Sequence, residues 1–437
     1  MKQTALVTTQ LLTGADEDSL QRWTELRLGY TETQGLPALR DAISERYTRV
    51  GPDEVVVLAP EEGIFLTMQA ALRPGQHVIV TYPGYQSLYD VARSIGCTVS
   101  FWRPRCGPIR RCTLSHSKRA LVHSPFAPHP RLRTEPSGEL RFVVDDLEEL
   151  VHQGPKPALV ATNWPHNPTG ATLREEDLRR VAALVGDAGA LLFCDEMYRT
   201  LEHDPGTRPT AGADVGPHVV SLSGLSKTLG MPGLRIGWLA VRDAALRQRI
   251  LELKDFTTIC NSCASEVTGP GGRQPMSATT VAVSLWVSFR KSVDGAVDAD
   301  ELRLGDPPVY LLNPCTQVLA LMALRRHDAI LAEKLAIVRA NLDLLDRFFD
   351  KYRDHFAWVR PPASTVAFPK LTSAALGPRG IDDFCSRLVE ASGVLLLPAS
   401  VYGDAEFTDA RHFRIGYGRQ SMPVALEAFE AHLRSVL

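Results

Sequence analysis

The chain has 437 residues, of which 44% are hydrophobic and 22% are charged, so it can bury large cores. This length predicts a globular protein of about two or three domains. The formal charge of -2 at pH 7 creates no global field that would favour nucleic acid or an anionic membrane as a partner. Any site for an anion must therefore be local.

No part of the sequence is typical of a membrane or secreted protein. The N-terminal residues lack an apolar core followed by a cleavage site, and no apolar run reaches the ~18 residues of a spanning helix. We therefore expect a cytoplasmic protein. Its eight cysteines are too scattered for a disulfide framework. Cys260 and Cys263 have the spacing of half a zinc site, but Cys106 and Cys112 do not supply the other half, so we expect no metal.

Short apolar strand patterns alternate along the chain with amphipathic helix patterns. We expect helices over residues 36–47, 62–72, 85–95 and 174–185. We expect strands over residues 55–58, 77–81, 98–102, 158–162, 190–194 and 219–222. This alternation predicts an α/β fold with a mostly parallel sheet that is covered by helices on both faces.

Polar residues gather where the predicted strands end. In sheets of this kind, functional sites lie just beyond the carboxyl ends of the strands. The candidates by this criterion are Glu62, Gly63, Tyr85, Asn163, Asn167, Asp195, Tyr198 and residues 223–227.

Lys227 lies in a loop rich in small residues, with Arg235 eight positions later. A lysine that is desolvated or flanked by cations loses its proton and becomes a nucleophile, which can form a Schiff base with an aldehyde. The alternative is a solvated lysine in a surface loop. The run Gly224-Leu-Ser-Lys-Thr228 suggests the phosphate loop of an ATPase, but glycine does not precede the lysine and the upstream glycine is missing.

Several separate motifs, in a fixed order, resemble one known family. They are Asn167-Pro-Thr-Gly170, Asp195-Glu-Met-Tyr198, Ser226-Lys227 with Arg235, and Phe413-Arg-Ile-Gly-Tyr-Gly418. The chain resembles the pyridoxal-phosphate-dependent (PLP-dependent) aminotransferases of class I/II, fold type I, from about Tyr30 to Arg419. The resemblance implies a large domain over residues 49–340 with a seven-stranded type of sheet, and a smaller α+β domain from residues 1–48 and 341–437.

The resemblance assigns four residues to the pyridine ring of the cofactor and its phenolic oxygen. Asp195 would keep the ring nitrogen protonated, so that the ring acts as an electron sink. Asn167 and Tyr198 would bind the phenolic oxygen, and Tyr85 would stack on the ring. From the residues alone, Asp195 could equally be a helix cap, Asn167 part of an ordinary turn and Tyr85 a core tyrosine.

The phosphate requires backbone donors and a cation. Glu62 and Gly63 are predicted to open a helix, whose free amides and dipole would hold a dianion. Arg235 would add a guanidinium, and Ser223 or Ser226 a hydroxyl. Many relatives have serine three positions before the lysine, where this chain has glycine, so the choice between the two serines stays open.

The resemblance also implies substrate and subunit contacts. Arg414 would bind the α-carboxylate of an amino acid through two parallel hydrogen bonds, whereas the alternative is a surface salt bridge. Asn167 and Gly35 would lie beside the same substrate. Tyr30 would reach the phosphate of the partner subunit, which implies a homodimer with shared sites.

These assignments predict an enzyme that moves an amino group between an L-α-amino acid and a 2-oxo acid. Lys227 would hold the cofactor as an aldimine and, once released, remove the α-proton of the substrate. Residues 255–262 also resemble a branch with capreomycidine synthase-like enzymes, so elimination or cyclisation is the alternative. A further alternative is a catalytically impaired homologue that only binds PLP.

Three features depart from the family pattern. Residues 106–137 and 267–317 interrupt it as irregular inserts, which are lids, lineage-specific loops or retained introns. Removing the second insert would join Glu266 to Val318 and restore the pattern. The chain also begins late, without the arm that closes over substrate in relatives, which points to a truncated gene model or an incomplete lid.

Overall fold

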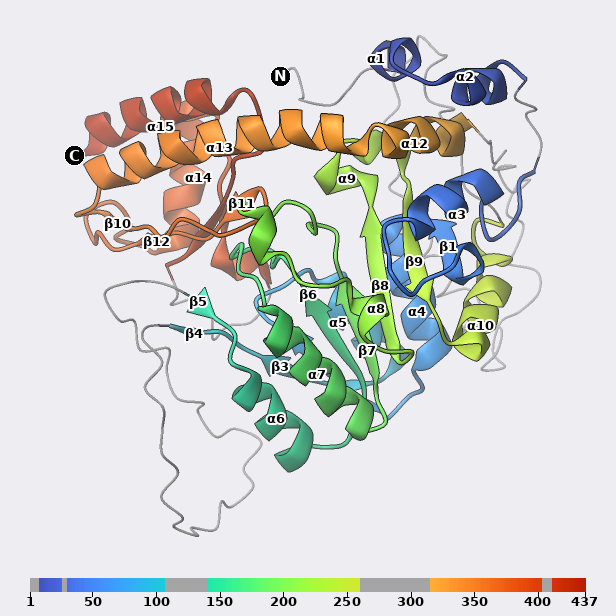
Figure 1. The fold of residues 1–437 in the computed structure, drawn as a ribbon. Helices are drawn as coiled ribbons and strands as arrows, with labels where there is room; N and C mark the ends of the chain where they lie inside the picture. The colour runs from blue at the N-terminus through green and yellow to red at the C-terminus, as the bar shows by residue number, and fades with distance from the viewer. Residues whose placement is uncertain (1–7, 26–29, 107–139, 260–314, 403–410) are drawn as a thin grey trace, which may run out of the picture. The chain divides into compact units, whose positions relative to one another are not determined.

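Seven strands form one mixed, mostly parallel sheet in the computed structural model of this chain, in the order β1-β9-β8-β7-β6-β2-β3 (Figure 1). The structure describes residues 8–25, 30–106, 140–259, 315–402 and 411–437. The strands are β1 (Val55–Leu58), β2 (His77–Thr81), β3 (Thr98–Trp102), β6 (Pro157–Asn163), β7 (Leu191–Asp195), β8 (Val219–Gly224) and β9 (Gly237–Val241). The sheet confirms the predicted α/β fold.

The chain divides into two compact units. Unit 1 comprises Met1–Thr4, Gly75–Thr210 and Ala332–Leu437, and unit 2 comprises Ala5–Pro74 and Ala211–Leu331. The domain boundaries 1–48, 49–340 and 341–437 stay a prediction.

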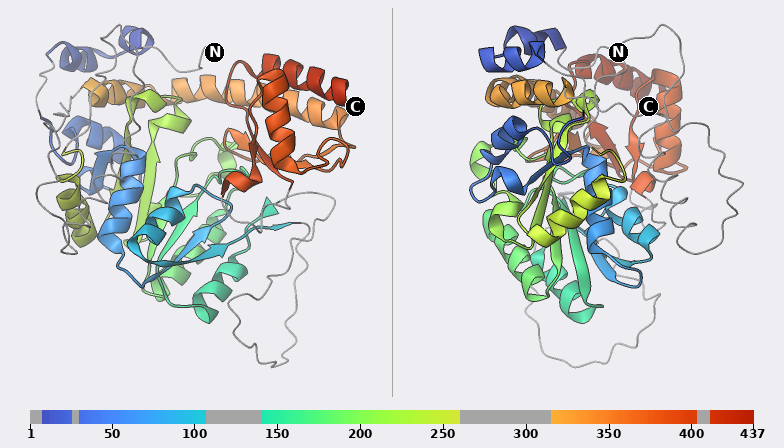
Figure 2. Two further views of the ribbon diagram at one scale, coloured as in Figure 1. Left: turned by 180° about the vertical axis from the view of Figure 1, so that it is seen from behind. Right: turned by 90° about the vertical axis from the view of Figure 1, so that its right-hand side faces the viewer.

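In unit 1, the strands β7, β6, β2 and β3 are parallel neighbours. The side chains of β2, β6 and β7 are largely buried because helices cover both faces, whereas only Trp102 is buried in β3, at the edge of the sheet. Figures 1 and 2 show α6 (Val144–Gln153) and α7 (Glu175–Asp187) on one face and α5 (Ser87–Ile95) on the other. A short hairpin of β4 (Arg105–Cys106) and β5 (Leu140–Arg141) follows β3 along the chain.

The C-terminal part of unit 1 has its own core. Helices α13 (His327–Lys351), α14 (Ile381–Ser392) and α15 (Met422–Val436) pack around a small sheet of β11 (Val366–Ala367), β14 (Phe413–Gly416) and β13 (Leu397–Pro398). The pair β10 (Phe356–Ala357) and β12 (Lys370–Leu371) contributes Phe356 and Leu371 to this core. Its largest fully buried side chains are aromatic: Phe349, Phe384, Phe413, Phe429 and Tyr417.

In unit 2, β9 pairs antiparallel with both β1 and β8. Helix α4 (Pro60–Ala71) packs against these strands and against α10 (Ala244–Lys254), whereas α3 (Pro37–Ser44) packs against α12 (Cys315–Arg325). Two N-terminal helices, α1 (Thr8–Thr13) and α2 (Glu17–Thr24), lie along α12. The Arg325 guanidinium on α12 binds Asp16 and Asp18.

Helix boundaries differ from the prediction more than strand boundaries do. Strands β1, β2 and β3 have the predicted ends, because each is a short apolar run between polar or turn residues. Helix α4 begins two residues earlier than predicted, at Pro60, since proline has no amide proton to lose at the first helical position. Helix α5 begins at Ser87, which leaves Tyr85 in the turn before it.

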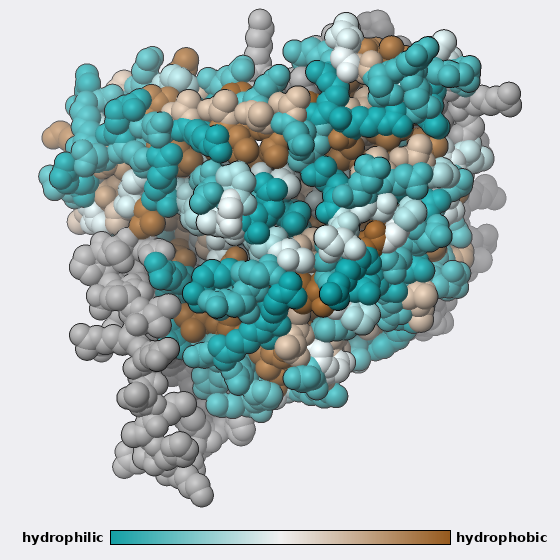
Figure 3. Space-filling view, in the orientation of Figure 1, coloured by the Kyte–Doolittle hydropathy of each residue, from teal (hydrophilic) through white to brown (hydrophobic). Residues whose placement is uncertain are grey.

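The exposed face of α6 and α7 is hydrophilic, as Figure 3 shows, and Arg180 on α7 pairs there with Asp145 and Glu148 on α6. Among the described residues, no helix is both long and apolar enough to cross a membrane. Residues 107–137 and 267–314 of the two predicted inserts, and the Cys260–Cys263 pair, lie outside the described residues.

Candidate active site

In unit 1, the ends of β6 and β7 bring two of the predicted ring-binding residues together. Asn163 and Asp195 are paired across the two strands, and the Asn163 Nδ2 donates a hydrogen bond to the Asp195 carbonyl at 3.0 Å. The Asn163 Oδ1 accepts from the backbone amide of Asn167 at 2.7 Å. Asn163 therefore positions both neighbours. Its place at a strand end was visible in the sequence, but the sequence assigned it no role.

Asp195 is buried, with 4% of its surface exposed. Its Oδ1 accepts a hydrogen bond from the amide of Met197 at 3.1 Å, which is the helix-cap type of contact that the sequence left as the alternative. That contact fixes the carboxyl group in the turn after β7. It is compatible with a role toward a ligand, because a carboxylate has several acceptor positions.

Tyr198 lies in the same turn and is buried. Burial raises the pKa of the Tyr198 hydroxyl to about 12, although the positive charge of Arg414 opposes the rise. The phenol therefore keeps its proton near neutral pH and can donate a hydrogen bond to a ligand oxygen.

Arg414 extends from β14 toward Asn167. Its Nη1 donates to the Asn167 Oδ1 at 3.1 Å, and its side chain is half-buried. Within the described ranges, no ion pair includes Arg414. The guanidinium is thus placed beside the predicted ring-binding residues, with donors left for a carboxylate.

Tyr85 is 43% exposed, so it is not the core tyrosine that the sequence allowed. Its loop is anchored through its neighbours. The hydroxyls of Tyr82 and Tyr89 both donate to the carbonyl of Tyr402, at 3.0 and 2.8 Å, and Gln86 donates to the carbonyl of Val401 at 2.9 Å. This anchoring fixes the loop that carries the Tyr85 ring.

In unit 2, three chain segments meet at one end of the strands. The register places Leu58 at the end of β1, Gly237 at the start of β9 and Gly224 at the end of β8 in one row. A side chain at Gly237 would lie 2.6 Å from the Ser223 carbonyl and 2.7 Å from Pro60, so only glycine fits. The start of α4 and the loop that carries Lys227 are therefore close neighbours.

Lys227 belongs to the one-turn helix α9 (Leu225–Thr228), and its side chain is exposed. In this single chain the lysine has the exposure of the alternative that the sequence left open, a lysine in a surface loop. The reason is local: a single turn directly after a strand leaves its third residue at the surface. The loop itself is fixed, because the Leu225 amide donates to the Ile236 carbonyl at 3.1 Å.

The two candidate serines differ in their surroundings. The Ser226 hydroxyl oxygen is buried and has no hydrogen-bond partner among the described residues, whereas Ser223 is half-buried. A buried hydroxyl without a partner costs about 1–3 kcal/mol, so Ser226 is the serine that would gain more from a phosphate oxygen. Arg235 is exposed, and its Nη1 donates to the carbonyl of Pro232 at 3.2 Å.

The start of α4 corrects the prediction for Gly63. The Gly63 amide donates to the Ala59 carbonyl at 3.0 Å, so it already takes part in the helix. The amides that precede this first helical bond belong to Glu61 and Glu62, since Pro60 has none. A side chain at Gly63 would lie 2.8 Å from Leu58, so this glycine serves packing.

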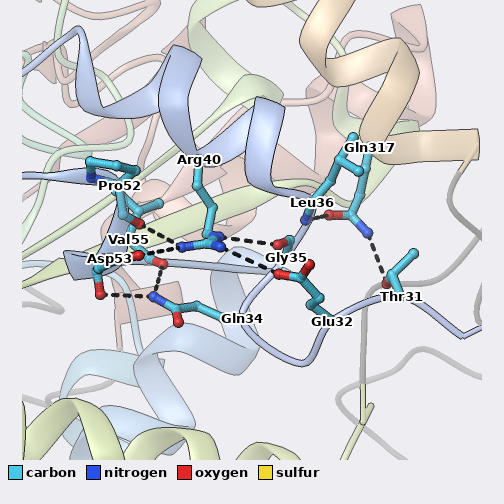
Figure 4. Close-up of polar contacts among 10 residues, drawn as sticks. All are labelled: Thr31, Glu32, Gln34, Gly35, Leu36, Arg40, Pro52, Asp53, Val55 and Gln317. Atoms are coloured by element: carbon cyan, nitrogen blue, oxygen red, sulfur yellow. Dashed lines mark hydrogen bonds and ion pairs between the residues drawn. The ribbon is translucent and has the colours of Figure 1, made fainter. Parts of the chain in front are cut away.

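Gly35 is held by a buried network (Figure 4). The backbone of Gly35 has a φ of +111°, and a side chain there would lie 2.5 Å from Val57. The Arg40 guanidinium donates to the Gly35 carbonyl at 3.1 Å, and the Gln317 Oε1 accepts from the Leu36 amide at 2.7 Å. The segment before Gly35 is tied down as well, through Thr31, Glu32, Gln34, Pro52, Asp53 and Val55. Tyr30, at the beginning of this segment, is 70% exposed.

These groups fit pyridoxal phosphate. Unit 1 offers a buried carboxylate, a protonated phenol and an amide, which match a pyridine nitrogen and a phenolic oxygen. Unit 2 offers an amine on an exposed lysine, and a buried hydroxyl without a partner among the described residues, in Ser226.

Comparison with known proteins agrees with this chemistry. The family model described as aminotransferase class I and II matches residues 15–270. Capreomycidine synthase of Streptomyces vinaceus is 25% identical over 385 residues, which cover 87% of this chain and 74% of that protein. Valine–pyruvate aminotransferase of Mycobacterium tuberculosis is 29% identical over 247 residues, and the match covers 55% of each chain.

Solved structures share the fold. A PLP-dependent aminotransferase from Streptococcus suis matches with a TM-score of 0.72 at 22% identity, over 99% of this chain and 92% of that one. The PLP-dependent cyclase OrfR matches with a TM-score of 0.69 at 24% identity, over 99% of this chain and 91% of that one. With more than half of its residues matched by the family model, the chain belongs to the class I and II aminotransferase family of PLP-dependent enzymes.

Proposed function

We propose that this enzyme is an aminotransferase that moves an amino group between an L-α-amino acid and a 2-oxo acid. The contact of Arg414 with Asn167 is the observation that supports this most directly. A guanidinium beside a ring-binding amide is suited to hold the α-carboxylate of an amino acid while its α-carbon faces the cofactor.

The residues of unit 1 would orient the cofactor ring and the substrate. When bound, PLP supplies an electron sink and a carrier for the amino group. Asp195 would hold a proton at the pyridine nitrogen, and its burial keeps water from competing for that hydrogen bond. Tyr198 and Asn167 would bind the phenolic oxygen. The raised pKa of Tyr198 keeps its proton available for this contact.

The residues of unit 2 would supply the amine and the phosphate contacts. The Lys227 amine would hold the cofactor at its aldehyde group and would, when free, take the α-proton of the substrate. Ser226, Arg235 and the amides of Glu61 and Glu62 would hold the phosphate. Gly63 would support them only by its packing.

We further propose that two copies of the chain form a homodimer, in which Tyr30 binds the phosphate of the partner subunit. Two exposed aromatic residues in unit 2 support a partner contact: Tyr30 is 70% exposed and Phe256 is 85% exposed. Large aromatic side chains at a surface are typical of protein interfaces.

The relationship to capreomycidine synthase favours a second candidate function, elimination or cyclisation on the same cofactor. A third candidate is a homologue that binds PLP without catalysis. The residues that hold the ring and the phosphate would be the same in all three. The distinction therefore depends on the product.

A screen of amino acids with the purified protein and PLP tests the proposal. We expect an absorbance band of the lysine-bound cofactor that Lys227→Ala abolishes, and formation of pyridoxamine phosphate with one 2-oxo acid per donor. Ammonia or a cyclised product, identified by mass, would instead support the second candidate. A band that no amino acid changes would support the third.

The conservative variant Arg414→Lys tests the carboxylate contact. Because lysine cannot make two parallel hydrogen bonds, we expect KM for the amino acid to rise about tenfold or more while the cofactor band stays unchanged. Arg411→Lys is the matched control, since Arg411 donates to the carbonyl of Gly377. An unchanged KM in Arg414→Lys would contradict the assignment.

A further inference from the structure

The carboxylate of Glu62 is turned aside from the helix start that it belongs to. Glu62 is the third residue of α4, which begins at Pro60 after the N-cap residue Ala59. Its Oε1 accepts hydrogen bonds from the hydroxyls of Thr257 and Thr258, both at 2.7 Å. Its Oε2 is buried and has no hydrogen-bond partner in the described part of the chain.

A fully buried lysine stands behind this contact. The Lys254 Nζ, at the end of α10, donates to the Thr258 hydroxyl oxygen at 2.7 Å, and Lys254 has 0% of its surface exposed. The Thr258 hydroxyl thus accepts from the ammonium group and donates to the carboxylate. This relay gives the negative charge of Glu62 a positive counterpart at the end of α10.

The usual behaviour of a glutamate at this helix position is different. A glutamate at the third helical position commonly reaches back to the amide of the N-cap residue. In that position the Glu62 carboxylate would occupy the start of α4 and repel a second anion there. A phosphate dianion needs the same amides and the same helix dipole.

We propose that Thr257, Thr258 and Lys254 are positioning residues that hold the Glu62 carboxylate away from the start of α4, so that the Glu61 and Glu62 amides can bind the phosphate of PLP. The inference rests on the proposed phosphate site. It gives a role to Thr257 and Thr258, which lie within the segment 255–262, and to Lys254 just before that segment. The three residues act through Glu62 and do not touch the cofactor themselves.

Titration of the apo protein with PLP and with pyridoxal, which lacks the phosphate, tests the proposal. In the double variant Thr257→Val with Thr258→Val, valine keeps the shape of threonine but cannot donate to Glu62. We expect the Kd for PLP to rise about tenfold, whereas the Kd for pyridoxal stays unchanged. Lys254→Met should shift the Kd for PLP in the same direction.

A third substitution separates positioning from damage to the fold. Adding Glu62→Ala to the double variant removes the competing carboxylate, so the Kd for PLP should return to within about twofold of the original value. Thr67→Val is the matched control, because Thr67 is buried on the same helix and its hydroxyl makes no hydrogen bond among the described residues. We expect no change in its Kd.

If the original chain binds PLP, three results would overturn this inference and leave the proposed function standing. They are an unchanged Kd for PLP in the double variant, an equal loss for pyridoxal, and a loss that Glu62→Ala does not reverse. If the original chain binds no PLP, the proposed function fails first, so the two failures are distinguishable.

Discussion

At the residue scale, the part of the candidate site in unit 1 is built on a buried histidine. His166 has 0% of its surface exposed, and its Nδ1 lies 2.8 Å from the Thr169 hydroxyl. His166 lies in the loop that carries Asn167. Its ring packs edge-on against the Phe142 ring, and the two ring centroids are 4.7 Å apart. The loop therefore depends on an imidazole that is sealed from water.

This burial predicts a pH dependence of stability. Burial lowers the pKa of His166 from 6.5 to about 3, so the unfolded chain binds a proton there before the folded chain does. The contribution of the neutral His166 to the free energy of unfolding is therefore complete above pH 6.5, and it is lost as the pH decreases toward 3. By pH 5 this histidine should reduce the free energy of unfolding by about 2 kcal/mol.

Urea unfolding at pH 7.5 and pH 5 measures this effect. Between pH 7.5 and pH 5, the free energy of unfolding of His166→Gln should fall by about 2 kcal/mol less than that of the original chain, because glutamine takes up no proton. His152→Gln, on the exposed face of α6, is the control. Equal losses in the original chain and in His166→Gln would contradict the prediction.

At the scale of elements, the sequence predicts strands well and contacts poorly. Strand β1 is a continuous apolar run and β2 has the apolar centre Val78-Ile79-Val80, so local pattern alone indicates both strands. The contact of Arg414 with Asn167 joins residues 247 positions apart, and that of Thr258 with Glu62 joins residues 196 positions apart. No local pattern encodes such pairs. The first was expected only through the family resemblance, and the second was not expected.

The start of α12 bears on the retained-intron hypothesis. Gln317, the last residue of the predicted insert, is fully buried, and its side chain binds the Leu36 amide and the Thr31 hydroxyl. Excision of residues 267–317 would place Glu266 before Val318. A carboxylate can accept from the same amide and from the same hydroxyl, since a hydroxyl can donate as well as accept. The contacts are therefore compatible with either residue.

A chain without residues 267–317 should accordingly fold and bind PLP. We expect its thermal midpoint to equal or exceed that of the full chain. Adding Glu266→Leu to the deletion should cost about 1–3 kcal/mol, because the Leu36 amide would lose its partner. Excision is contradicted if the chain without residues 267–317 does not fold. It is also contradicted if both inserts are found in the abundant transcript and in peptides of the purified protein.

At the scale of the whole molecule, the homodimer can be tested by complementation. Lys227→Ala removes the amine of its own subunit, whereas Tyr30→Ala would weaken the phosphate contact of the partner's site. In a dimer of one copy of each variant, one site would combine an intact Lys227 with an intact Tyr30 from the other copy. The second site would carry both defects. A site built from a single copy has no such combination.

Mixing the two variants under conditions that exchange subunits should therefore restore activity that neither variant has alone. Random pairing makes about half of the dimers mixed, each with one of its two sites complete, so recovery should approach about a quarter of the original activity. Light scattering after size-exclusion chromatography would establish the dimer independently. If the activity of the mixture only equals the summed activities of the two separate variants, Tyr30 serves its own subunit or no site. A site shared between subunits would regain activity in the mixed dimers.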